Sequence, residues 1–124
     1  MKKTFRKEAD VKAAVKEILA QDVKEGSWYF MPSMNGYGRA GVPDFIVCHK
    51  GYLIGVETKF GSNKPTPAQR MELLKICCAR GLALIINENN LIELREVLDL
   101  VHSGLFLSAR HIAFNNLRKY GIEA

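Results

Sequence analysis

The 124-residue sequence predicts a single α/β domain, spanning residues 1–124, in which helices flank a mixed β-sheet. Three observations lead to this fold class. Residues 8–24 carry an amphipathic helical pattern, residues 41–59 hold two apolar runs joined by a tight turn, and residues 66–87 combine a helical segment with a buried type of strand. The order helix, strand, hairpin, helix, strand therefore predicts a mixed sheet with helices packed against it.

The first helix is predicted over residues 8–24, because apolar side chains recur there at helical spacing. A helical wheel places Glu8 within the apolar stripe and Glu17 on the opposite side, toward solvent. Glu8 is either a site residue or a first-turn glutamate favoured by the helix dipole. A short strand is then predicted over residues 28–31, followed by a glycine-rich loop. The predicted stripe comprises Val11, Val15, Ile18, Leu19 and Val23.

The second half of the chain begins with a well-marked helix. Thr66 before Pro67 is a good pair for the N-cap and first helical position, and the helix should extend to about Arg80, with Gly81 closing it. The remaining predicted elements are a buried strand over residues 82–87, a turn at Asn89-Asn90, a short return strand over 91–94, and helices near 95–103 and 107–120.

Composition narrows the class of protein. The net charge of +5 and a pI near 9.2 favour a polyanionic partner. No apolar run approaches the roughly 20 residues that cross a bilayer, and the first residues are charged, so no membrane partner and a cytoplasmic location are expected. The three cysteines lack zinc-ligand spacing with histidine and are expected to be reduced thiols that pack in the protein.

The segment GVPDFIVCHKGYLIGVETK, residues 41–59, carries charged side chains inside apolar runs. A two-residue turn at Lys50-Gly51 would place Asp44 opposite Glu57, with Cβ atoms about 4.5–5.5 Å apart. Two carboxylates that close repel each other unless a cation or a proton lies between them, so the pair is a candidate metal site. Lys59 falls on the same strand face as Glu57. The alternatives are a three-residue loop, which offsets the carboxylates, or a solvated strand face with a Glu57–Lys59 pair.

With these charges in place, GVPDF followed by VETK resembles the core of the PD-(D/E)xK (restriction-endonuclease-like) nucleases. Within that superfamily the chain most resembles the VRR-NUC domain of the stand-alone phage and bacterial type. The resemblance extends to a glutamate early in the first helix, to Arg39 in the glycine-rich loop, and to Gln69, which it implies is a further catalytic residue. It covers roughly residues 5–87, and the C-terminal region adds no family signal.

The resemblance implies a set of ligands for Mg²⁺ or Mn²⁺. These would be Asp44, Glu57 and the main-chain carbonyl of Thr58, with Glu8 binding a second ion or a metal-bound water. Hard divalent ions prefer such oxygen ligands, and they lower the pKa of bound water. Lys59 would orient or polarise the attacking water and stabilise charge on the phosphate.

Basic and aromatic residues near this segment are candidates for DNA contact. Each basic residue alone is more often a solvated surface charge, but together they are predicted to hold flanking phosphates, with Arg39 and Lys64 the first choices. Tyr37 either stacks on an unpaired base or packs locally. The predicted phosphate-binding residues are Arg39, Lys50, Lys64 and Arg70.

The expected function is that of a metal-dependent endodeoxyribonuclease, and the resemblance implies branched DNA, such as Holliday junctions, as substrate in a bacterial or phage-infected cell. Symmetrical cutting would call for a homodimer. The alternatives are a non-catalytic nucleic-acid-binding module with a nuclease fold, and a monomeric nuclease or nickase acting on linear duplex. Apolar residues that would form either a dimer interface or core are Phe106, Leu107, Ile112, Phe114 and Leu117.

Overall fold

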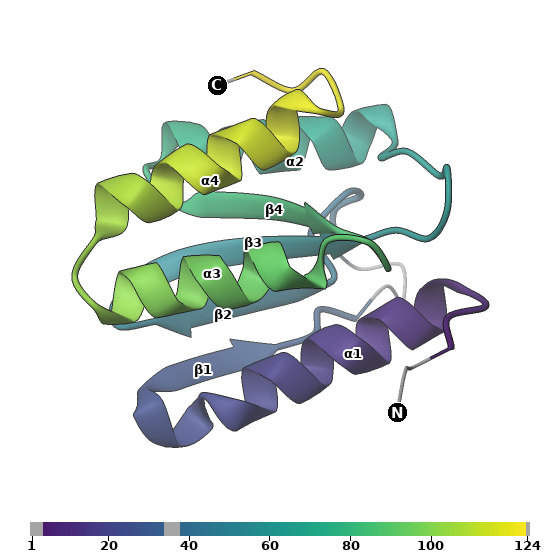
Figure 1. Cartoon of the computed structure of the whole chain (residues 1–124). Helices are drawn as coiled ribbons and strands as arrows, with labels where there is room; N and C mark the ends of the chain where they lie inside the picture. The colour runs from purple at the N-terminus through teal and green to yellow at the C-terminus, as the bar shows by residue number, and fades with distance from the viewer. Residues whose placement is uncertain (1–3, 34–37, 124) are drawn as a thin grey trace.

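A four-stranded sheet in the order β1-β2-β3-β4 organises the computed structural model, which describes residues 4–33 and 38–123 (Figure 1). The β1-β2 and β2-β3 pairs are antiparallel and the β3-β4 pair is parallel, so the predicted mixed α/β fold is confirmed. The strands are β1 (Ser27–Phe30), β2 (Phe45–His49), β3 (Tyr52–Thr58) and β4 (Leu82–Ile86). The helices are α1 (Glu8–Gln21), the 3₁₀ turn η1 (Val23–Glu25), α2 (Pro67–Cys78), α3 (Leu91–His102) and α4 (Phe106–Arg118).

The sheet separates two hydrophobic cores, and β4 supplies alternate side chains to each. Leu82, Leu84 and Ile86 join the larger core, under α1 and α3, while Ala83 and Ile85 join the smaller core with residues of α2. This alternation is the period of two expected of a strand buried on both faces. Helix α4 runs along β4 and contributes to both cores (Figure 1).

A buried asparagine of α4 pairs with β4. The Asn116 side chain is fully buried, accepts a hydrogen bond from the Ile85 N–H at 2.8 Å, and donates one to the Ile85 carbonyl at 2.9 Å. The amide therefore satisfies backbone groups that a neighbouring strand would otherwise pair.

The β2-β3 hairpin has the predicted register. Lys50 and Gly51 have φ of 51° and 87°, the positive values that a type I′ turn requires at both central residues. Phe45 consequently pairs with Val56, and Asp44 immediately precedes β2, beside the end of β3. A three-residue loop is excluded, because it would shift every pair.

Helix α2 begins as predicted but ends differently. Thr66 accepts the Gln69 N–H at 3.2 Å, and the Gln69 side chain accepts the Thr66 N–H at 2.8 Å, which forms a capping box. At the other end Arg80, rather than Gly81, takes the left-handed conformation with φ of 69°, and the Gly81 N–H bonds to the Ile76 carbonyl. Gly81 is required instead for space, because a Cβ there would lie 2.9 Å from Ile76.

The predicted return strand over residues 91–94 is wrong, because helix α3 begins at Leu91. The apolar residues that suggested a strand continue at helical spacing, and Leu94, Val97, Leu98 and Val101 are all buried. Asn90 directs the chain into the helix, since its side chain accepts the Asn87 N–H and donates to the Ile85 carbonyl.

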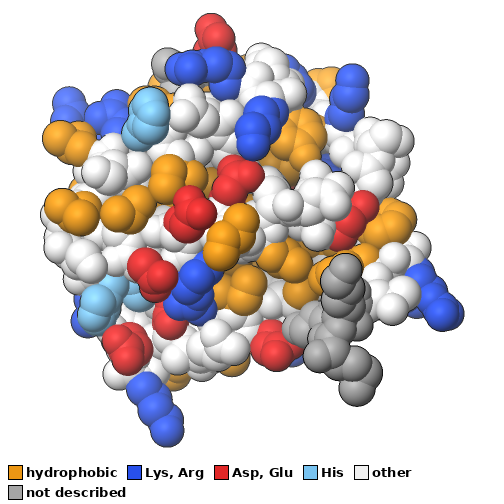
Figure 2. Space-filling model, viewed as in Figure 1, with side chains coloured by type: hydrophobic (Ala, Val, Ile, Leu, Met, Phe, Trp, Pro, Cys, Tyr) orange, Lys and Arg blue, Asp and Glu red, His pale blue; other side chains and the backbone are white. Residues whose placement is uncertain are grey.

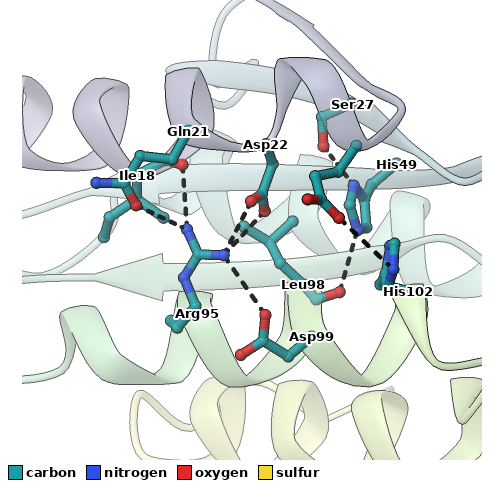
Figure 3. A network of polar contacts seen from close by, with 10 residues as sticks. Ile18, Gln21, Asp22, Ser27, His49, Arg95, Leu98, Asp99 and His102 are labelled. Carbon is teal, nitrogen blue, oxygen red and sulfur yellow. Dashed lines mark hydrogen bonds and ion pairs between the residues drawn. The ribbon is translucent and has the colours of Figure 1, made fainter.

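A polar network fastens α3 to α1 and to the hairpin (Figure 3). The guanidinium of Arg95 donates to both carboxylate oxygens of Asp22 at 3.0 Å and to the Ile18 carbonyl at 3.2 Å. Nearby, buried His49 bonds to the Leu98 carbonyl through Nε2 and to the Ser27 hydroxyl through Nδ1. Burial lowers the pKa of His49, which favours the neutral ring, and the fold supplies a partner for each of its two nitrogens.

The C-terminal apolar residues are mostly core rather than surface. Leu117 is buried, and Phe106, Ile112 and Phe114 pack against the two cores, whereas Leu107 is 76% exposed. Cys77 is buried as expected, but Cys48 and Cys78 are exposed thiols. Across residues 4–33 and 38–123 no helix is long and apolar enough to cross a membrane.

Candidate active site

The predicted metal-binding residues lie at one end of the sheet. Glu57 and Thr58 are the last two residues of β3, Asp44 immediately precedes β2, and Glu8 opens α1. The N-terminal turn of α1 and the C-terminal ends of β3 and β4 lie at the same end of the molecule (Figure 1). The topology therefore brings to one end of the sheet residues that are separated by up to 50 positions in the chain.

Asp44 is held in place by the end of β3. Its Oδ2 accepts hydrogen bonds from the Thr58 N–H at 2.9 Å and from the Thr58 hydroxyl at 2.5 Å. Because Thr58 is fully buried, these bonds fix the carboxylate relative to the sheet. The second oxygen, Oδ1, lies 3.7 Å from Nζ of Lys12.

Glu57 is a buried carboxylate with an unsatisfied oxygen. The residue is only 2% exposed, and Oε1 has no hydrogen-bond partner within residues 4–33 and 38–123, while Oε2 lies 3.6 Å from Nζ of Lys59. Burial, followed by the negative charge of Asp44, raises the pKa of Glu57 to about 8, although Lys59 opposes the shift. At neutral pH Glu57 thus favours its protonated form unless a further cation compensates its charge.

Lys59 lies beside Glu57 as the strand periodicity predicts, and it is almost as deeply placed, at 8% exposed. Its N–H bonds to the Ile86 carbonyl at 3.0 Å, which carries the β3-β4 pairing one residue beyond the strand. The alternative of a solvated strand face is therefore wrong, because both charged side chains are buried.

Glu8, rather than Glu17, is the acidic residue of α1 near this site. Its charge is among those that raise the pKa of Glu57, whereas Glu17 is exposed further along the helix. Sequence reasoning missed Lys12, whose Nζ lies 3.6 Å from Oε2 of Glu8 and 3.7 Å from Oδ1 of Asp44. The available signal was its spacing, four residues after Glu8 and so on the same helix face.

The donor set suits a hard divalent cation that completes its shell with water. Within the described part of the chain no three His, Cys, Asp or Glu side chains converge closely enough to bind a metal, so Glu8, Asp44 and Glu57 do not form a ready three-carboxylate cage. Buried Oε1 of Glu57 nevertheless has no hydrogen-bond partner among the described residues, and the charge of Asp44 acts on the Glu57 carboxylate. Mg²⁺ typically uses one or two carboxylates and retains several waters, so these residues fit it.

Gln69 is committed to the capping box of α2, since its side-chain oxygen accepts the Thr66 N–H. The helix it opens supports the segment before Asp44. Gly41 has φ of 85°, and a Cβ there would lie 2.4 Å from the Ala68 carbonyl group, so only glycine allows this close approach. In this structure Gln69 thus serves a helix end that packs on the GVPD segment.

The four predicted phosphate-binding residues have different surroundings. Arg39 is exposed but bonds through Nε to buried Glu72 at 2.5 Å. Arg70 donates to the carbonyls of Tyr120 and Gly121, at 2.6 and 3.0 Å, and so anchors the C-terminal segment. Lys50 occupies the hairpin turn, at the opposite end of β2 and β3 from the carboxylates, so the fold does not bring it to the site.

Lys64 is the best placed of the four. It is exposed and belongs to the loop that begins just after Lys59. Together with Lys119 it lines a cavity of about 480 Å³. By contrast, the face over α1, α3 and α4 mixes acidic, basic and apolar side chains, with Lys and Arg mainly toward its edges (Figure 2). That face is therefore not a continuous basic surface. Tyr37 lies outside the described residues.

A second cavity, of about 470 Å³, lies between the hairpin and α2, where Ile46, Leu53 and Ile76 form apolar walls and Glu72 is the buried acidic residue. Sequence reasoning gave no indication of it, because its walls come from three separate elements.

Neither a scan against protein-family models nor a search of curated proteins finds a match to this chain.

Proposed function

We propose that the protein is a metal-dependent endodeoxyribonuclease with a PD-(D/E)xK core of the VRR-NUC type. The observation that carries the proposal is Glu57, a buried carboxylate whose Oε1 is unpartnered and whose neighbours are Asp44 and Lys59. Such an arrangement destabilises the folded protein unless a cation or proton compensates it. A binding site for a cation gives this cluster a function.

The side chains divide the catalytic work. Mg²⁺ or Mn²⁺, when bound, would lower the pKa of water and neutralise charge on the phosphoryl oxygens. Asp44, oriented by Thr58, and Glu57 would hold the ion, with the Thr58 carbonyl as a further ligand. Lys59 would keep a buried positive charge beside the phosphate and the attacking water.

The proposed substrate is DNA, and specifically branched DNA such as a Holliday junction, which a homodimer would cut symmetrically. Helix α4 offers little surface for such a dimer, because most of its apolar residues pack in the cores. Among the described residues, an alternative surface for a dimer is formed by exposed apolar side chains of the hairpin and β1, notably Trp28, Phe30 and Leu53.

A non-catalytic DNA-binding module is the second candidate, but the site disfavours it. Phosphate binding needs exposed cations, and it gives no reason to bury Glu57 without a hydrogen bond for Oε1. A monomeric nuclease or nickase on linear duplex would use the same residues, so substrate and oligomeric state must separate it from a junction-cutting dimer.

The first experiment compares cleavage of a four-way junction with that of a linear duplex of matched sequence, in Mg²⁺, Mn²⁺ or EDTA. Wild type, Glu57→Gln and Glu96→Gln are assayed, since Glu96 is an exposed carboxylate on α3. We expect metal-dependent cutting by wild type and Glu96→Gln, and none by Glu57→Gln. Binding of DNA without cutting in every metal would support the recognition module instead.

Cutting confined to the junction by a dimeric protein, sized by light scattering, supports the structure-specific form of the proposal. Equal cutting of both substrates by a monomer would replace it with the linear-duplex nuclease.

A further inference from the structure

Lys12 lies between two of the carboxylates proposed to bind metal. It is one helical turn after Glu8, and its Nζ is 3.6 Å from Oε2 of Glu8 and 3.7 Å from Oδ1 of Asp44. These two contacts come from different elements, α1 and the segment before β2. Lys12 therefore joins the helix to the site rather than making only a helix-surface pair.

The partners of the other carboxylate oxygens of Asp44 and Glu57 show why the position of Lys12 matters for cation binding. Oδ2 of Asp44 already accepts two hydrogen bonds from Thr58, and Oε2 of Glu57 faces Lys59. The oxygens with capacity for a further cation are Oε1 of Glu57, which is unpartnered, and Oδ1 of Asp44, which faces only Lys12 among the interactions of the described residues. A cation bound by both Asp44 and Glu57 would thus compete with the Lys12 ammonium for Oδ1 of Asp44.

We propose that Lys12 is the resident cation of the metal-free site and that a divalent ion must displace its ammonium from Asp44 in order to bind. This inference rests on the proposed metal-dependent function, and it deepens that function by naming the residue that sets metal affinity. An ammonium and a dication close to one oxygen repel each other strongly. Displacement is feasible, because the Lys12 side chain is 36% exposed and flexible and can remain paired with Glu8.

The same geometry explains how the folded protein tolerates these carboxylates without metal. Lys12 partly compensates the negative charges of Glu8 and Asp44. Its positive charge also lowers the pKa of Glu57, which opposes the effect of burial. Lys12 is therefore a positioning residue, because its contacts are with the carboxylates of Glu8 and Asp44 and it acts through them.

The test is a calorimetric titration of the full chain with Mn²⁺ in the absence of DNA. Wild type is compared with Lys12→Met and with Lys16→Met, which removes the same charge from an exposed position one turn further along α1. We expect Lys12→Met to bind Mn²⁺ about tenfold more tightly than wild type, and Lys16→Met to stay within about twofold. Equal Kd values for wild type and Lys12→Met overturn the proposal.

Thermal unfolding supplies a readout that an altered fold would not imitate. In EDTA, Lys12→Met should melt below Lys16→Met, because its carboxylates are uncompensated, and saturating Mn²⁺ should raise its Tm by more than it raises that of wild type. Equal Mn²⁺-induced rises in the two proteins contradict displacement.

Glu57→Gln separates the two levels of the argument. Mn²⁺ binding that is lost in Glu57→Gln but is equally tight in wild type and Lys12→Met keeps the metal site and removes the role of Lys12. Absence of Mn²⁺ binding in wild type and in Lys12→Met overturns both. Binding only to Lys12→Met supports Lys12 as the competing cation and contradicts metal-dependent cleavage by the wild type.

Discussion

Glu57 is the residue at which the requirements of folding and of the proposed chemistry conflict most clearly. A carboxylate with 2% exposure and an unpartnered oxygen is stable in the folded protein mainly when it is protonated. A bound cation would replace that proton, so metal binding and proton release at this residue would be coupled. The conflict can be measured without substrate or metal.

The first prediction concerns the pH dependence of stability in EDTA. The pKa of Glu57 is about 8 in the folded state and near 4.5 when unperturbed, so between these values the folded state retains a proton that the unfolded state releases. This contribution to the free energy of unfolding is full below pH 4.5 and is lost as pH rises through 8, at up to about 1.4 kcal/mol per pH unit.

Urea unfolding of wild type and Glu57→Gln at several pH values between 5 and 9 tests this. The neutral variant lacks the titration, so its stability relative to wild type should increase steadily with pH and level off above pH 8. Parallel curves for the two proteins would contradict a raised pKa at Glu57.

A second prediction concerns Lys59, which is a buried charge rather than a surface one. Lys59→Met should reduce cleavage by about a hundredfold or more, because it removes fixed positive charge beside the phosphate. It should also raise the pKa of Glu57 further, since Lys59 is the largest of the influences that lower that pKa. Single-turnover cleavage and the pH dependence of urea unfolding measure the two effects.

Lys16→Met is the matched control for Lys59→Met, and it should change neither property. A Lys59→Met protein that cleaves normally would remove Lys59 from the proposed site.

What the sequence could predict at this scale was residue type and register. A two-residue turn placed Asp44 beside Glu57, and strand alternation placed Lys59 with it, and both are confirmed. Burial of Glu57 and the position of Lys12 depend on how α1 packs over the sheet, which no local pattern encodes. Arg70 is likewise a residue type common on surfaces, but its hydrogen-bond partners lie 50 and 51 positions further along the chain.

At the scale of elements, one polar side chain adds hydrogen bonds to the apolar packing between α4 and β4. Asn116 is buried and bonds both to the N–H and to the carbonyl of Ile85. Replacing it by an apolar residue leaves both backbone groups without these bonds in a site from which water is excluded. Within the described residues, β4 is an edge strand with no fifth strand beside it, and the Asn116 side chain pairs with its Ile85 backbone groups instead.

Asn116→Ala is therefore predicted to lower the free energy of unfolding by about 2–4 kcal/mol. Asn115→Ala, at the neighbouring position whose amide bonds to His111 on the exposed side, should change it by less than about 0.5 kcal/mol. Denaturant unfolding at pH 7 measures both variants. Similar losses for the two would show that helix propensity, and not the bond to β4, is responsible.

Element prediction succeeded where capping and turn residues act locally, as at Thr66 and the Lys50-Gly51 turn. It failed over residues 91–94, where four residues of mixed pattern fit a strand or the first turn of a helix. Only the later buried residues of α3, together with the hydrogen bond from Asn90 to the Ile85 carbonyl of β4, decide between them. The decisive interactions there are again between elements.

On the scale of the whole molecule, the two ends of the sheet differ in function under the proposal. The carboxylates, Lys59 and the cavity lined by Lys64 lie at one end, and the hairpin turn with Lys50 lies at the other. The basic composition predicted a polyanionic partner but could not assign cations to either end. DNA binding should therefore depend on which end of the sheet loses a charge.

The last prediction compares Lys64→Gln with Lys50→Gln, both in a Glu57→Gln background that prevents cleavage. Both substitutions remove one exposed lysine charge, so net charge is matched. Lys64→Gln should weaken DNA binding and reduce the slope of log K against log salt by about 0.9, as expected for one lost phosphate contact, while Lys50→Gln should leave the slope unchanged. Fluorescence anisotropy across a salt series measures this. Equal slopes for the two variants would mean that DNA responds to net charge alone, and they would place the phosphate contacts away from the loop that follows Lys59.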